Sequence, residues 1–298
     1  MTEISRHELC VLQNRLRPRL SAGMRLTPRK VQVVVATFLT RAVRSDQFDP
    51  LFGSVKGRNK CLRQLVGHGY LDRAAVSFRF AASVYHIGRA GVPVALAAIA
   101  GQGTDLSDEE IRMLRRRPVL SQLEHTLRIV DVYGAFVLRG EGGSGVSVAR
   151  FLPEQAVRFE YDVRIRGSAA WRQRCFAPDG AFVISAGEGV PAVVLFVEVD
   201  LATVPLTRFA AKYGAFDHVV AGGLASARTG CANAAMAVVT VSEARLRRLR
   251  RLAEEAGCSR VVLTTFAEVE RGGLSARWTE AGSGRPLTLR ELLAEIGG

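Results

Sequence analysis

The feature that most restricts the fold is a short apolar run at residues 192–199, which a single charged residue, Glu198, interrupts. Such a run is typical of a central β-strand that is buried on both faces. Strand and helix patterns alternate around it, and this order predicts an α/β (α+β) domain with helices packed on one mixed sheet. The expected elements are helices at 119–138, 204–216, 243–256 and 287–296, and strands at 158–166, 181–185, 192–199, 234–241 and 260–265.

The first hundred residues carry a different pattern. Thr27 and Pro28 are typical of a helix start, and apolar residues recur behind them at helical spacing. A short helix is expected at 45–51 and a third helix at 56–66, followed by β-prone stretches at 70–73, 76–80 and 83–87. Three helices followed by a hairpin are the order of a winged helix-turn-helix, whose third helix enters the major groove of DNA.

The charge distribution favours a polyanionic partner. The net charge is +13, and residues 1–100 hold 16 Lys and Arg against 5 Asp and Glu, whereas the remainder holds 25 against 23. A basic first third joined to a near-neutral remainder suggests a module that binds nucleic acid, with double-stranded DNA as the expected partner. The alternatives are a solvated basic surface or an anionic membrane, although no basic amphipathic helix supports the membrane.

The third helix and the hairpin supply the side chains that DNA recognition needs. Arg and Lys suit phosphates and guanine edges, and Asn and Gln suit adenine edges. Base choice is expected from Arg58, Asn59 and Arg63; the alternative is that this charged face is only solvated. The candidate DNA-binding residues are Lys56, Arg58, Asn59, Lys60, Arg63, Gln64, Arg73 and Arg79.

Four segments are expected: a basic arm at 1–26, a winged-helix domain at 27–100, a connecting helix at 101–118, and an α/β domain at 119–298. No apolar run is long enough for a membrane helix and no secretory signal is evident, so a soluble cytoplasmic protein without membrane contact is expected. A homodimer is compatible with this organisation. Trp171 and Trp278 are expected to be packing residues.

A group of acidic residues is the candidate for chemistry. Asp179 precedes a strand, and Glu198 and Asp200 end the apolar strand, where their spacing of two places them on one face. Converging carboxylates can hold Mg²⁺ or Mn²⁺, which could activate water against a phosphodiester. The alternative is structural: Pro-Asp-Gly is common turn chemistry, and Lys212 could pair with Asp200.

Several motifs together resemble the replication-relaxation family of plasmids and other mobile elements. The resemblance covers about residues 26–280. It implies a role in replication, relaxation or mobilisation of DNA, with replication or mobilisation proteins as partners. The motifs are the winged-helix start, Leu123-Glu124-His125-Thr126-Leu127, Pro178-Asp179-Gly180, Phe196-Val197-Glu198-Val199-Asp200 and Lys212-Tyr213.

The second half also resembles the PD-(D/E)XK nuclease superfamily, and so implies a restriction-endonuclease-like domain. Asp179 matches the first acid of that motif and Glu198 the second. Asp200 stands where a lysine is expected, and Lys212 on the next helix could replace it. The resemblance implies that these four residues would be catalytic in an active enzyme.

Three functions follow from these patterns. The first is a DNA-binding accessory or regulatory protein with a degenerate nuclease-like domain. The second is a metal-dependent endonuclease that nicks DNA, and the third is a winged-helix transcriptional regulator. A further basic helix either extends the DNA footprint or is only solvated; its arginines are Arg245, Arg247, Arg248, Arg250 and Arg251.

Overall fold

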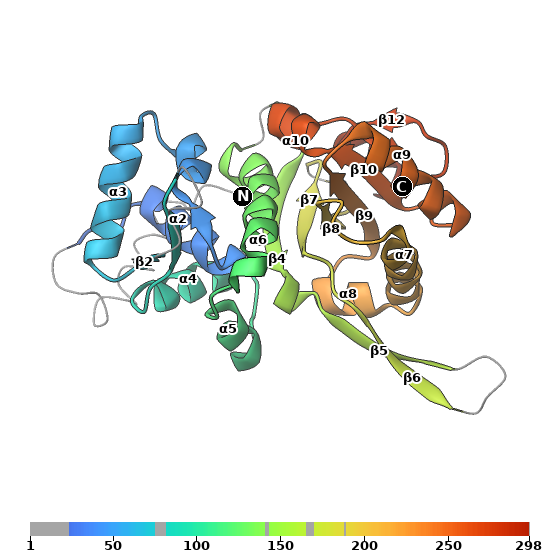
Figure 1. The fold of residues 1–298 in the computed structure, drawn as a ribbon, viewed down its shortest axis with the longest axis horizontal. Helices are drawn as coiled ribbons and strands as arrows, with labels where there is room; N and C mark the ends of the chain where they lie inside the picture. The colour runs from blue at the N-terminus through green and yellow to red at the C-terminus, as the bar shows by residue number, and fades with distance from the viewer. Residues whose placement is uncertain (1–23, 75–81, 141–142, 165–169, 188, 298) are drawn as a thin grey trace. The chain divides into compact units, whose positions relative to one another are not determined.

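The computed structural model describes residues 24–74, 82–140, 143–164, 170–187 and 189–297, and it confirms the mixed α/β class (Figure 1). The chain divides into two units, Met1–Gly140 and Glu141–Gly298. The division lies after residue 140, whereas the sequence predicts the second domain to start at 119. The difference arises because the buried stripe of the helix at 120–133 packs inside the first unit: Leu123 and Leu127 contact Ala42 and Val84.

The first unit is mainly helical, and most of its elements follow the sequence prediction. Thr27 caps the first described helix, since its hydroxyl accepts a hydrogen bond from the Lys30 backbone N–H. The elements are α2 (Pro28–Thr40), β1 (Val43–Arg44), η1 (Ser45–Leu51), α3 (Val55–Gly67), β2 (Leu71–Arg73), β3 (Val84–Ile87), α4 (Gly91–Ala100), α5 (Asp108–Leu114), α6 (Leu120–Tyr133) and the π-helical η3 (Gly134–Leu138).

The first unit contains a small antiparallel sheet in the order β1-β3-β2. Val43 of β1 pairs with Tyr85, and Leu71 of β2 pairs with Ile87. The sequence predicts the strands that became β2 and β3 but not β1, because two residues are too few to show an alternating pattern. The predicted strand at 76–80 and residues 1–23 of the basic arm lie outside the described residues.

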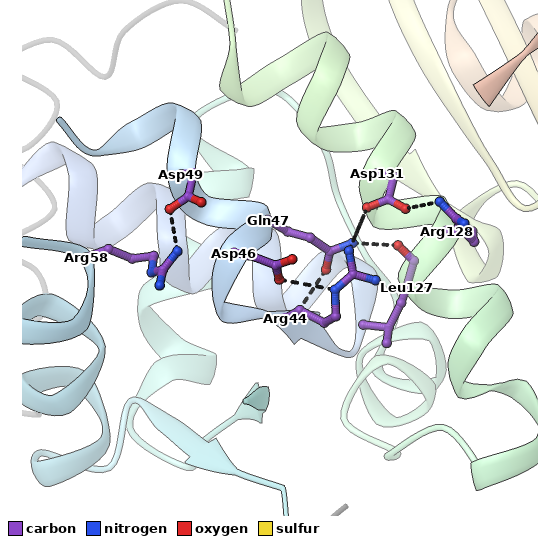
Figure 2. Close-up of polar contacts among 8 residues, drawn as sticks. All are labelled: Arg44, Asp46, Gln47, Asp49, Arg58, Leu127, Arg128 and Asp131. Carbon is purple, nitrogen blue, oxygen red and sulfur yellow. Dashed lines mark hydrogen bonds and ion pairs between the residues drawn. The ribbon is translucent and has the colours of Figure 1, made fainter. Parts of the chain in front are cut away.

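A buried polar network ties η1 to α6 (Figure 2). The Gln47 side-chain amide donates to the Leu127 carbonyl at 2.7 Å and to the Asp131 carboxylate at 2.6 Å. Arg44 and Arg128 also bind the Asp131 carboxylate, at 3.4 and 3.1 Å. The network fixes the segment that leads into α3, so it helps to set the position of α3 within the unit.

The second unit is built on a mixed sheet. In its core the Phe196 ring packs against the rings of Phe159 and Phe216. The elements are β4 (Ser147–Pro153), η4 (Glu154–Ala156), β5 (Phe159–Arg164), β6 (Trp171–Phe176), β7 (Gly180–Ser185), β8 (Val193–Asp200), α7 (Leu206–Ala221), α8 (Leu224–Thr229), β9 (Asn233–Thr240), α9 (Glu243–Glu255), β10 (Val261–Thr265), α10 (Phe266–Gly272), η5 (Gly273–Ser275), β11 (Trp278–Glu280), β12 (Pro286–Leu287) and α11 (Leu289–Gly297).

The strand order of this sheet is β12-β11-β10-β9-β8-β7-β4. β8 is interior and all eight of its residues are buried, as its apolar sequence predicts. It runs antiparallel to β7 and parallel to β9; Phe196 lies opposite Ala181 on one side and Met236 on the other. Helices α7 and α9 pack together, and α9 lies against β9 and β10. This packing brings α7 and α9 to the carboxyl end of β8.

Several features of this unit differ from the sequence prediction, among them the place of β5 and β6 and the exposure of one tryptophan. β5 and β6 form a separate two-stranded hairpin that extends away from the main sheet (Figure 1). Trp171 on this hairpin is 66% exposed, so its assignment as a packing residue is wrong, whereas Trp278 is buried. No helix in the described part of the chain is long and apolar enough to cross a membrane.

Candidate nucleic-acid interface and carboxylate cluster

Helix α3 presents a basic, polar face. Ser54 caps its N-terminus by accepting a hydrogen bond from the Gly57 N–H at 3.1 Å, and Leu62 and Leu65 bury its opposite face. No acidic residue occurs between Val55 and Gly67. Five of the six candidate DNA-binding residues on the helix are exposed: Lys56, Asn59, Lys60, Arg63 and Gln64.

Arg58 differs from the other five residues. The sequence predicts an exposed side chain, but Arg58 is buried and its guanidinium forms an ion pair with Asp49 of η1 (Figure 2). Its Nε also donates a hydrogen bond to the Asn59 side-chain oxygen at 3.2 Å. Arg58 therefore joins α3 to η1 and orients the amide of Asn59. Asp49 lies nine positions earlier, and no local pattern in the sequence marks it as the partner.

Replacing Arg58 with methionine is expected to lower the free energy of unfolding by about 1–2 kcal/mol, because charge-assisted hydrogen bonds are lost. The affinity for duplex DNA is expected to stay within about twofold, since the guanidinium is turned toward Asp49. Urea denaturation and fluorescence anisotropy measure the two effects. Lys60→Met is the matched control, and an equal loss of DNA affinity in both variants would show that Arg58 contacts DNA directly.

A hollow of about 450 Å³ lies beside α3. Arg58, Asn59 and Arg63 from α3 and Arg73 from β2 line it, together with Tyr85 of β3, and none of its lining residues is acidic. The guanidinium groups of Arg63 and Arg73 favour an anionic ligand such as a phosphate, whereas that of Arg58 is paired with Asp49. Arg79, the remaining candidate on the predicted wing, lies outside the described residues.

Asp200, at the end of β8, forms an ion pair with Arg245 of α9. The Asp200 carboxylate accepts two hydrogen bonds from the Arg245 guanidinium, at 2.8 and 3.1 Å, and one from the Thr240 hydroxyl at 2.7 Å. The Asp200 side chain is completely buried and that of Arg245 is 12% exposed. The structural alternative that paired Lys212 with Asp200 is therefore wrong, and Arg245 belongs neither to a solvated face nor to an exposed DNA footprint.

Glu198 and Lys212 form a second ion pair. The Lys212 ammonium contacts the Glu198 carboxylate, which is almost fully buried, while the lysine is partly exposed. Burial lowers the pKa of Lys212, but the carboxylates of Glu198 and Asp179 outweigh this effect and raise the pKa above its ordinary value. The lysine therefore stays charged at neutral pH. Its partner, Glu198, is one of the three carboxylates that the sequence suggests as metal ligands.

Asp179 lies at the start of β7, next to these residues. Its carboxylate accepts a hydrogen bond from the Val199 N–H at 2.7 Å, and its own N–H donates to the Val197 carbonyl at 2.9 Å. The structure therefore places Asp179, Glu198 and Lys212 together at one end of the sheet. Within the described ranges, however, no three His, Cys, Asp or Glu side chains are placed to hold a metal ion. The predicted set of Asp179, Glu198 and Asp200 is not assembled as ligands, because Arg245 and Thr240 bind Asp200.

The comparison with protein families decides the affiliation of this chain. A family model described as replication-relaxation matches residues 30–235, which is more than half of the chain. The chain belongs to the replication-relaxation family. Membership confirms the resemblance found in the sequence and suggests involvement in plasmid or mobile-element replication or relaxation. No curated protein and no solved structure matches the chain significantly.

In this replication-relaxation protein the family match includes α3, Asp179, Glu198, Asp200 and Lys212. Arg245 lies beyond the match, in a helix that the sequence shows only as strongly basic. Its ion pair could not be predicted, because Asp200 lies 45 positions away and four other arginines share the helix. Arg247, Arg248 and Arg251 are exposed, so they remain candidates for a DNA footprint or a solvated face.

Proposed function

We propose that this replication-relaxation protein binds double-stranded DNA through α3 and the adjoining sheet of its first unit, in the manner of a winged helix. In this role it is an accessory or regulatory DNA-binding protein of plasmid or mobile-element replication, relaxation or mobilisation. The observation that carries the proposal is the α3 face, where five exposed polar and basic residues adjoin a hollow lined by three arginines. This combination matches the chemistry of phosphates and base edges.

In this mechanism some residues of α3 bind phosphates and others bind base edges. Lys56, Lys60 and Arg63 supply the affinity for phosphates, which depends on salt, and Arg73 extends the contact to β2. Asn59, held by Arg58, and Gln64 read base edges. If six phosphates are contacted, the slope of log affinity against log salt concentration is about −5.

The test is charge reversal on α3 in the full chain. Lys60→Glu with Arg63→Glu is expected to lower the affinity for duplex DNA at least tenfold and to reduce the magnitude of the salt slope by about 2. Fluorescence anisotropy at several salt concentrations measures both. The matched control is Arg112→Glu on α5, an exposed arginine outside this face. Unchanged duplex affinity in the double variant would refute the proposal.

A metal-dependent endonuclease is the second candidate, favoured by the meeting of Asp179, Glu198 and Lys212 at one end of the sheet. Against it, Asp200 is bound by Arg245. Supercoiled plasmid incubated with Mg²⁺, Mn²⁺ or EDTA separates the candidates. Nicking that requires the metal and is lost in Glu198→Gln would establish the nuclease, whereas duplex binding without nicking supports the accessory protein.

A further inference from the structure

A second hollow, of about 400 Å³, lies wholly within the second unit, between the β5–β6 hairpin and α7. We refer to it as the hairpin groove. Tyr161, Val163 and Arg174 line it from the hairpin, and Lys212, Gly214 and His218 line it from α7. None of the described residues that line the groove is acidic, although Lys212 contacts the Glu198 carboxylate behind it. The duplex-binding proposal for α3 makes no use of this site.

The charges in the hairpin groove favour an anion. The strand register places Arg174 opposite Tyr161 and Arg172 opposite Val163, so both arginines lie on the face that carries the groove-lining residues of β5. Lys212 on α7 contributes further N–H donors, although its charge is paired with Glu198 and lies close to Asp179. A phosphate in the groove would therefore meet positive charge from the hairpin and hydrogen-bond donors from the helix.

The groove also contains a stacked pair of rings. The Tyr161 and His218 rings lie 4.4 Å apart with an interplanar angle of 23°. Flat ring surfaces next to cations are the combination with which proteins bind unpaired bases together with their phosphates. Trp171, which is 66% exposed, lies opposite Arg164 near the free end of the same hairpin and offers a further ring outside the groove.

Gly214 leaves open space along the α7 side of the hairpin groove. It lies inside α7, where glycine is less favourable than alanine. Its backbone is not left-handed, and a Cβ built on it meets no atom within 4 Å. Neither the local backbone nor close packing therefore requires a glycine at this position. Ala211 and Ala215 also line the groove from α7, so small side chains keep it open along this helix.

We propose that the hairpin groove holds one nucleotide of single-stranded DNA, with the phosphate on Arg174 and Lys212 and the base against the Tyr161–His218 stack. Pockets for small ligands begin at about 300 Å³, so the groove can admit a nucleotide but not a duplex. Bases become available for stacking only in an unpaired strand. The proposal extends the proposed DNA-binding function to the second unit and rests on it in one respect, namely that DNA is the natural ligand.

The experiment measures binding of the full chain to a fluorescein-labelled oligo-dT strand and to a labelled duplex of equal length. Gly214→Phe, which fills the groove, and Arg174→Glu, which reverses its charge, are each expected to lower single-strand affinity at least tenfold. Duplex affinity is expected to stay within twofold. The matched controls are Gly214→Ala and Arg271→Glu, a reversal at an arginine on α10 whose side chain is 72% exposed. Both controls are expected to bind the single strand within twofold of the wild type.

The outcomes separate this proposal from the first. If the wild type does not bind the single strand, or if Gly214→Phe and Arg174→Glu both bind it normally, the hairpin groove proposal fails while duplex binding by α3 can stand. An equal loss of single-strand and duplex affinity would assign the groove to the duplex footprint and would also overturn it. Thermal melting of each variant checks folding; since Arg174 is exposed, its variant keeps the test informative if Gly214→Phe unfolds.

Discussion

Replacing Asp200 with alanine is expected to lower the free energy of unfolding by about 3–5 kcal/mol, because it leaves the charge of Arg245 buried without its carboxylate. The size of the effect follows from burial: the Asp200 side chain has no exposed surface, and Thr240 and the Arg245 guanidinium share its oxygens. Urea denaturation followed by circular dichroism measures the loss. If Asp200 were instead a metal ligand, its replacement would cost little stability in the absence of metal.

Two further variants sharpen this prediction. Arg247→Ala, an exposed arginine on the same helix, is expected to change stability by less than about 0.5 kcal/mol. The double variant Asp200→Ala with Arg245→Ala is expected to be more stable than the sum of the two single losses predicts, because no buried charge is left alone. Additive losses would show that the two side chains are not coupled.

Replacing Lys212 with methionine is expected to destabilise the protein by about 3 kcal/mol at pH 8, at the lower end for buried pairs because the lysine is partly exposed. Removing the ammonium leaves the buried Glu198 carboxylate without the opposite charge that it contacts. Urea denaturation at pH 8 measures the loss, and a change of less than about 1 kcal/mol would contradict the argument.

The stability of the wild-type protein is also expected to depend on pH in the alkaline range, through the ammonium group of Lys212. The pKa of Lys212 is raised in the folded state, chiefly because the carboxylates of Glu198 and Asp179 outweigh the effect of burial. Its contribution to stability is therefore fully present below the pKa of the unfolded chain, about 10.4. It is lost as the pH rises through the higher folded value. Lys212→Arg keeps the charge and is the control: it should retain most of the stability at pH 8.

Both predictions bear on the chemistry of the second unit. Asp179 and Glu198 lie beside Lys212, whereas Asp200 serves as the partner of a buried arginine. This arrangement forms a scaffold of ion pairs at the end of β8. The plasmid assay therefore tests these side chains for catalysis, and the stability measurements test them for a structural role.

Local sequence patterns were sufficient for most single elements. Ser107 and Glu110, three positions apart, form a capping box at the start of α5, within the connecting helix predicted at 101–118. The run at 192–199 became the interior strand β8, and α3 spans Val55–Gly67 close to the predicted 56–66. These features depend on residues within a few positions of one another, and such short-range interactions are encoded directly in the order of residue types.

Which elements pack together, and which charged side chains form ion pairs, became clear only in the folded chain. The order of residue types alone predicted a mixed α/β chain with a basic first third, a polar α3 and acids at the end of an apolar strand. It did not determine that α6 belongs to the first unit, that Arg58 turns toward Asp49, or that Arg245 pairs with Asp200. An ion pair depends on which side chains meet after folding, and several arginines of equal chemistry compete for each carboxylate. Only packing distinguishes the buried arginine from its exposed neighbours.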